Sequence, residues 1–187
     1  MWNVPNSLTM LRILLIPVFV GIFYTSNTFL SWHEKNVLAT LVFALAALTD
    51  WLDGYLARVL NQTSAFGAFL DPVADKLMVA AALVMLIEFE RVGALVAFII
   101  IGREIAISAL REWMAGMGEG SNVAVAFIGK VKTAAQMIAI LFLLYYDPIG
   151  SIDIKFIGQV LIIIAAFLTL LSMAYYLKAA WPRMSAK

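Results

Sequence analysis

The sequence predicts an all-α integral membrane protein with six transmembrane helices. Of its 187 residues, 64% are hydrophobic and only 13% are charged, and the mean hydropathy of +0.95 lies far outside the range of soluble domains. The apolar residues also fall in long runs, each close to the ~20 residues that a helix needs to cross the hydrocarbon core. At this length we expect a single membrane domain, residues 1–187.

The first three helices are expected at 7–25, 35–60 and 69–88. The first follows the polar stretch "PNS", and no small-residue cleavage site comes after it, so we interpret it as a retained span and not as a signal peptide. The second is bounded by "SNTFLSWHEKN" and "LNQTSAFG", which contain polar and turn-forming residues. The third ends at the charged stretch "EFERVG".

The last three helices are expected at 92–115, 127–146 and 154–178. The stretches that separate them, "GMGEGSNVA" and "DPIGSID", are rich in glycine and small polar residues, which favour turns.

Lysine and arginine are distributed unequally between the two ends of these helices. Six spans place both termini on one side, and ten of the 13 basic residues fall there. Only Lys35, Arg91 and Lys155 fall on the other side. Because basic residues accumulate in cytoplasmic loops, both termini are predicted to be cytoplasmic.

The composition excludes several kinds of function. A formal net charge of +1 argues against nucleic acid as a partner. The chain has no cysteine, and its only histidine, His33, falls in a predicted loop. Thiolate metal sites, histidine-rich metal sites and a Ser-His-Asp triad are therefore excluded.

Four aspartates interrupt the apolar sequence within "ALTDWLDGYLARVLNQTSAFGAFLDPVADKL", residues 47–77. Asp50 and Asp53 are three positions apart and Asp71 and Asp75 are four apart, so each pair projects from one helix face. Both pairs fall at the cytoplasmic ends of adjacent predicted helices. An aspartate at mid-bilayer costs about 2.5–3.5 kcal/mol, and four such charges repel one another, so the cluster requires positive charge. Carboxylate oxygens suit Mg²⁺ or Mn²⁺, and two such ions commonly serve phosphoryl chemistry.

Other interpretations of the single residues stay open. Any one aspartate at a helix end can face interfacial water or cap the helix. Gly54, Ala57 and Gly67 lie between the aspartates. Their small size lets a phosphate or a nucleotide approach the backbone, but it also permits close packing of helices.

The spacing of these residues resembles the signature of the CDP-alcohol phosphotransferase family. The family pattern is D-x2-D-G-x2-A-R-x8-G-x3-D-x3-D, and its eight fixed positions are matched here by Asp50, Asp53, Gly54, Ala57, Arg58, Gly67, Asp71 and Asp75. The stretches "PNSLTMLRILLIP", "GREIAISALREWMA" and "VAVAFIGKVKTAAQ" are similar to the bacterial branch that transfers a phosphatidyl group from CDP-diacylglycerol to sn-glycerol 3-phosphate. The resemblance implies a homodimer in the bacterial inner (cytoplasmic) membrane, with the active site facing the cytoplasm.

The resemblance implies that the aspartates bind metal and take part in catalysis. The expected ligands of two Mg²⁺ (or Mn²⁺) ions are Asp50, Asp53, Asp71 and Asp75. Asp75 is also the expected general base, which takes the proton from the acceptor hydroxyl.

The resemblance also implies a binding site for CDP-diacylglycerol. Gly54, Ala57 and Gly67 are expected around the cytidine, and Arg58 at the diphosphate or beside an aspartate. Three polar residues at the cytoplasmic start of the first helix either contact the nucleotide diphosphate or only anchor that helix: Asn6, Thr9 and Arg12.

A phosphorylated acceptor requires fixed positive charge at the cytoplasmic end of the site. The candidates are Arg111, Lys130, Lys132 and Arg103. A helix beginning at Gly129 would add backbone N–H groups. In the alternative interpretation, Arg111 and the two lysines only fix the orientation of the helices in the membrane. Arg103 then forms an internal ion pair with Glu104.

Two other functions remain open from the sequence. An enzyme of the same family with inositol, inositol phosphate or serine as acceptor would carry the same aspartates. A divalent-cation transporter would use them to bind its ion, but it also needs a polar route to the far side of the membrane. The stretches "VLATLVFALAAL" and "LMVAAALVMLI" contain no such route.

Overall fold

The computed structural model describes residues 4–59, 65–116 and 123–184. Within these ranges the chain forms six α-helices and no β-strand. The helices are α1 (Val4–Tyr24), α2 (Trp32–Val59), α3 (Ala65–Glu88), α4 (Ala94–Gly116), α5 (Val123–Tyr145) and α6 (Ile154–Met184). The predicted all-α architecture and the six predicted helices are therefore confirmed.

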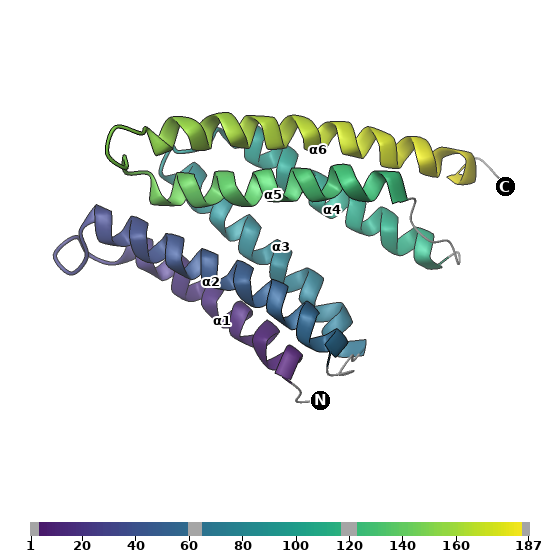
Figure 1. Ribbon diagram of the computed structural model, residues 1–187, viewed down its shortest axis with the longest axis horizontal. Coiled ribbons are helices and arrows are strands. Elements are labelled where there is room, and N and C mark those ends of the chain that lie inside the picture. The colour runs from purple at the N-terminus through teal and green to yellow at the C-terminus, as the bar shows by residue number, and fades with distance from the viewer. Residues whose placement is uncertain (1–3, 60–64, 117–122, 185–187) are drawn as a thin grey trace.

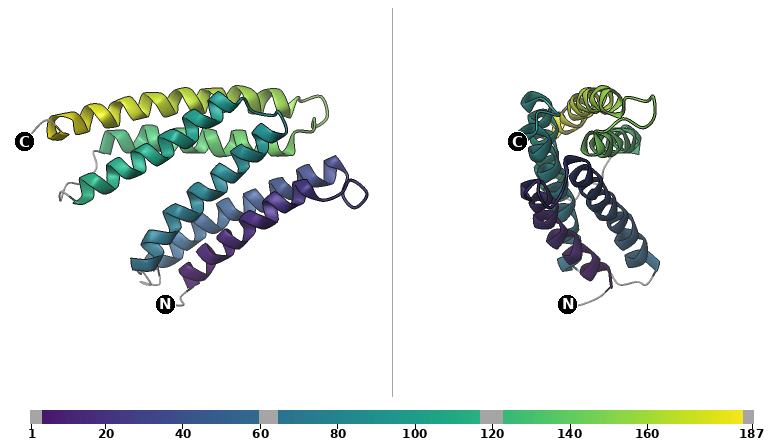
Figure 2. Two further views of the ribbon diagram at one scale, coloured as in Figure 1. Left: turned by 180° about the vertical axis from the view of Figure 1, so that it is seen from behind. Right: turned by 90° about the vertical axis from the view of Figure 1, so that its left-hand side faces the viewer.

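The helices form two groups of three. In one group α1 lies against α2 and α3, and in the other α6 lies against α4 and α5. α2 also contacts α5, which joins the groups. The groups lie close together at the end that carries the α1–α2 and α5–α6 connections, and they diverge toward the opposite end (Figures 1 and 2). α1 begins and α6 ends at that opposite end (Figure 1).

Apolar side chains from all six helices form one buried core. Those that are at most 1% exposed include Phe19, Phe43, Leu83, Ile100, Ile140 and Leu143. α5 and α6 approach closely at Gly158, where an added Cβ would lie 2.9 Å from Cγ of Leu143. Small residues permit such approaches between helices in membranes.

The outer surface is also apolar. Among the most exposed large side chains are Leu14, Phe69, Leu95, Phe98 and Phe167, which are 65–73% exposed. Soluble proteins rarely expose contiguous apolar surface on this scale, whereas lipid solvates it well.

Within the described residues, three segments are long and apolar enough to cross a membrane: Pro5–Tyr24, Trp32–Asp53 and Ile154–Lys178. α3 and α4 carry aspartate, glutamate, lysine and arginine side chains, and α5 carries two lysines. These charges lower the hydropathy of the three helices. Membrane crossing by α3, α4 and α5 therefore stays a prediction.

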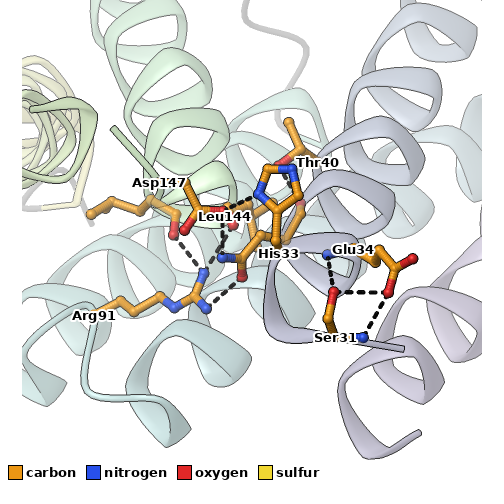
Figure 3. Close-up of polar contacts among 9 residues, drawn as sticks. Ser31, His33, Glu34, Thr40, Arg91, Leu144 and Asp147 are labelled. Atoms are coloured by element: carbon orange, nitrogen blue, oxygen red, sulfur yellow. Dashed lines mark hydrogen bonds and ion pairs between the residues drawn. The ribbon is translucent and has the colours of Figure 1, made fainter. Parts of the chain in front are cut away.

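Arg91, between α3 and α4, ties together the end of the molecule that carries the α1–α2 and α5–α6 connections (Figure 3). Its guanidinium donates hydrogen bonds to the carbonyl oxygens of Leu143 and Leu144 at 3.0 and 2.9 Å, and to Oδ1 of Asn36 at 2.6 Å. Asn36 in turn donates to Asp147 at 3.2 Å. Burial lowers the pKa of Arg91, but a guanidinium remains charged at neutral pH. Arg91 thus satisfies carbonyls that the last turn of α5 leaves without helical partners.

The other two basic residues at this end also have local partners. Lys35 donates to the carbonyl oxygen of Phe23 at 3.4 Å, near the end of α1, and to Oδ1 of Asn27 at 2.8 Å. Nζ of Lys155 lies 5.0 Å from the centre of the Tyr146 ring. All three basic residues that we predicted on the non-cytoplasmic side therefore have local partners at this end of the molecule.

Candidate active site

Arg12 on α1 bridges the two aspartates of α2. Its Nη1 lies 3.0 Å from Oδ1 of Asp50, and its Nη2 donates a hydrogen bond to Oδ2 of Asp53. The Arg12 and Asp53 side chains are 1% and 3% exposed, whereas that of Asp50 is 44% exposed. One guanidinium therefore contacts two carboxylates at the border between buried and exposed surface, and the three groups together carry one net negative charge.

Thr9, one turn earlier on α1, contacts the first aspartate of α3. Its hydroxyl lies within hydrogen-bonding distance of Oδ1 of Asp71 and 3.2 Å from the carbonyl oxygen of Pro5. A hydroxyl has a single proton, and a charged carboxylate is the stronger acceptor, so we assign the proton to Asp71. Asn6 is also buried. Asn6, Thr9 and Arg12 thus lie on one buried polar face of α1, which contacts three of the four aspartates.

Asp75 lies one turn after Asp71 on α3 and is partly buried. Asp50 and Glu104 are close enough to repel its carboxylate charge, while Arg12 and Lys76 attract it. Asp75 therefore lies within electrostatic reach of side chains from α1, α2 and α4. Gly67 is buried one turn before Asp71.

A second charged cluster joins α4, α5 and α6. Nζ of Lys132 and Nη1 of Arg103 both donate to the same oxygen, Oε1 of Glu104, and the Arg103 contact is 3.2 Å long. Nη2 of Arg103 donates to Oγ of Ser172 at 3.0 Å. Lys132 and Arg103 are only 2% and 6% exposed. The ion pair between Arg103 and Glu104 is therefore present, and Lys132 shares it.

Five side chains of the predicted site lie outside the described part of the structure: Gly54, Ala57, Arg58, Arg111 and Lys130. The predicted start of the fifth helix at Gly129 is wrong. α5 begins at Val123, so Gly129 follows more than a full turn of helix and its N–H has a helical carbonyl as partner. This N–H cannot contribute to a phosphate site.

Sequence reasoning missed the contacts of Glu104 with Lys132 and of Ser172 with Arg103. The sequence contains a periodic signal for the contact between Ser172 and Arg103. Thr169 and Ser172 are polar residues three positions apart within an apolar run, and both are fully buried. Polar residues at helical spacing in an apolar helix indicate a face that contacts other polar groups.

The donor set fits a hard divalent cation by its chemistry, because carboxylate oxygens are the ligands that such cations prefer. As the side chains are placed, however, no three acidic or histidine residues in the described ranges are grouped closely enough to hold one. Two of the aspartates face Arg12, and a third faces Thr9. Bringing all four carboxylates onto an ion would require changes in these contacts.

A model of the CDP-alcohol phosphatidyltransferase family matches residues 2–171. The chain belongs to this family. The signature residues of the family lie at the end of α2 and in the first half of α3, where Arg12 and Thr9 meet the aspartates.

Curated relatives of this family member extend over nearly its whole length. Proteins of Escherichia coli K12 and Shigella flexneri serotype 5b are each 50% identical over 181 residues, which cover 96% of this chain and 95% of each relative. A protein of Salmonella typhimurium is 49% identical over the same length and the same shares. All three are named CDP-diacylglycerol--glycerol-3-phosphate 3-phosphatidyltransferase.

Proposed function

We propose that this protein transfers the phosphatidyl group of CDP-diacylglycerol to sn-glycerol 3-phosphate. The products are phosphatidylglycerophosphate and CMP, and the reaction is the committed step toward phosphatidylglycerol and cardiolipin. The observation that carries the proposal is the 50% identity over 96% of the chain to proteins named for this transfer. Membership of a transferase family also argues against the alternative of a divalent-cation transporter.

The acidic cluster supplies the catalytic groups. The hydroxyl of glycerol phosphate forms a bond to the phosphorus that carries diacylglycerol, the bond from that phosphorus to the bridging oxygen breaks, and CMP leaves. Asp75 takes the hydroxyl proton. Its position on α3, partly buried and one turn after Asp71, places it within the acidic cluster and supports this role.

Asp50, Asp53, Asp71 and Asp75 would hold two Mg²⁺ or Mn²⁺ ions. When bound, these ions neutralise negative charge on the diphosphate and on the departing CMP. Arg12, which contacts Asp50 and Asp53, would then turn toward the diphosphate, together with Arg58. Gly54, Ala57 and Gly67 would leave room for the cytidine, and Asn6 and Thr9 would hold the nearby face of α1.

The phosphate of the acceptor would bind to the cations of α4 and α5. Lys132 and Arg103 lie side by side, both buried, at the Glu104 carboxylate. Arg111 and Lys130 would add positive charge toward the cytoplasm. Fixed buried cations favour a phosphorylated acceptor over inositol or serine, because a phosphate can replace the solvation that they have lost.

We further propose that all six helices cross the bacterial inner membrane, with both termini and the active site on the cytoplasmic side. The apolar outer surface supports this arrangement, and so does the fact that α1 begins and α6 ends at the same end of the bundle. Lys35, Arg91 and Lys155, which this arrangement places on the non-cytoplasmic side, have local partners. Because these contacts explain the three residues, they do not argue against the positive-inside rule. A homodimer is proposed from family membership, and cross-linking in native membranes would test it.

The test is CMP release by the purified protein in detergent, with CDP-diacylglycerol, Mg²⁺ and a panel of acceptors. Release that requires glycerol 3-phosphate, with inositol, inositol phosphate and serine inactive, is the expected result. Release with a different acceptor would keep the reaction and overturn the substrate. No release with any acceptor, accompanied by uptake of divalent cations into proteoliposomes, would overturn the enzyme.

A further inference from the structure

We propose that Glu104 is a positioning residue for the acceptor: its carboxylate holds Lys132 and Arg103 side by side as the binding site for the phosphate of sn-glycerol 3-phosphate. This inference rests on the proposed function. It concerns a residue outside the family signature, which sequence reasoning treated only as a partner of Arg103.

The geometry places one oxygen between two cations. Oε1 of Glu104 accepts hydrogen bonds from Nζ of Lys132 and from Nη1 of Arg103, so the two positive groups converge on a single atom from α5 and α4. The opposite side of the Arg103 guanidinium is held by Ser172 on α6, whose own hydroxyl donates to the carbonyl oxygen of Thr169 at 2.9 Å. Three helices therefore determine where the two cations lie.

Electrostatics explains why a carboxylate is needed at this point. Lys132 and Arg103 have side chains that are 2% and 5% exposed. Two buried cations that contact the same oxygen repel each other strongly. With Glu104 between them the trio carries a single net positive charge, which still attracts a phosphate. Without that carboxylate, the ammonium would turn away or lose its proton, because an unpaired buried charge is costly.

The location of Glu104 connects this phosphate site to the catalytic base. Its side chain is 22% exposed, unlike those of the two cations, and it lies on α4, which contacts α3, the helix that carries Asp75. We expect glycerol 3-phosphate, held by its phosphate at the cation pair, to present its hydroxyl toward Asp75. Misplacing the pair would weaken acceptor binding first.

The experiment compares Glu104→Gln with the wild-type enzyme in steady-state CMP release. We expect the KM for glycerol 3-phosphate to rise at least tenfold, while the KM for CDP-diacylglycerol changes less than twofold. The matched control is Glu112→Gln, an exposed carboxylate on the same helix, which should leave both KM values unchanged. Glu104→Asp keeps the charge on a shorter side chain, and its KM for the acceptor should lie between those of Glu104→Gln and the wild type.

A double-mutant cycle with Lys132→Met tests whether Glu104 acts through the lysine. The rise in KM for glycerol 3-phosphate in the double variant should be clearly smaller than the product of the rises in the two single variants. If the rises in KM of the two single variants multiply in the double variant, the inference is overturned. A KM for glycerol 3-phosphate that is unchanged or lowered in Glu104→Gln would also overturn it. Equal changes in both KM values with a lowered unfolding temperature would overturn it as well, because they would indicate a purely structural role for Glu104. If wild-type protein releases no CMP with glycerol 3-phosphate, it is the proposed function that fails.

Discussion

The guanidinium of Arg12 on α1 contacts the carboxylate of Asp53 on α2, and both side chains are almost completely buried. This pair shows how the apolar bundle tolerates a buried aspartate. The positive charge comes from the neighbouring helix, at a position 41 residues away in the sequence. Loss of either partner would leave the other charge buried and uncompensated.

Replacing Arg12 with methionine should therefore destabilise the protein and abolish activity. Removal of one partner from a buried ion pair costs about 3–5 kcal/mol, so the apparent unfolding temperature in detergent should fall by several degrees. Arg12→Lys should recover part of the stability, but it cannot contact two carboxylates through a planar fork. Lys178→Met removes an exposed cation from α6 and serves as control. An Arg12→Met protein as stable as that control would contradict the buried pair.

Thr9→Val should weaken the site by removing the hydrogen bond to Asp71. A hydrogen bond to a charged group contributes about 1.5–3 kcal/mol, so kcat/KM for CDP-diacylglycerol should fall about tenfold or more. Thr9→Ser retains the hydroxyl and should stay near the wild-type value. If both variants lose activity equally, the methyl group and its packing matter more than the hydrogen bond.

Asp75→Asn should lower kcat by about 10² to 10⁴, the usual contribution of a general base. The variant should retain its fold, because the asparagine side chain is nearly isosteric with aspartate. Glu88→Gln changes an exposed acid on the same helix and should have no effect on CMP release. Near-normal turnover by Asp75→Asn would remove Asp75 from its proposed role as base.

Chelation of divalent cations should stop CMP release, and addition of Mg²⁺ or Mn²⁺ should restore it. The physical reason is that four carboxylates cannot receive a diphosphate without further positive charge, because Arg12 contacts two of them but offsets only one negative charge. Substitution of Asp50 or Asp71 by asparagine should raise the concentration of cation required for half-maximal rate. Full activity in excess chelator would contradict the proposed metal site.

Arg91→Gln should lower the unfolding temperature without a matching effect on the chemistry. Its guanidinium holds two carbonyls of α5 and the side chain of Asn36 (Figure 3), at the end of the bundle away from the aspartates. The KM values of the folded fraction should stay within twofold of wild type. A selective loss of kcat at unchanged stability would show that this end of the molecule acts on the active site.

Much of this architecture follows from the sequence because it depends on local properties. The apolar runs predicted six helices, and the structure confirms them with shifts of a few residues at their ends. The spacing of Asp50 and Asp53, and of Asp71 and Asp75, predicted that each pair shares a helix face, since side-chain direction repeats with every turn. The start of α5 was misplaced because the glycine and the charges near Lys130 resemble a helix end, although the helix continues through them.

The partners of these side chains were decided only by the tertiary structure. Thr9 meets Asp71 across 62 residues, Lys132 meets Glu104 across 28, and Arg103 meets Ser172 across 69. Each contact depends on which helices lie side by side and on how far one is shifted along the other. Helical periodicity gives the face on which a charge lies, but it carries no information about the neighbouring helix or its axial position. The sequence alone therefore determined the membrane class, the helices and the chemistry-bearing residues, and the packing of the helices determined which charge balances which.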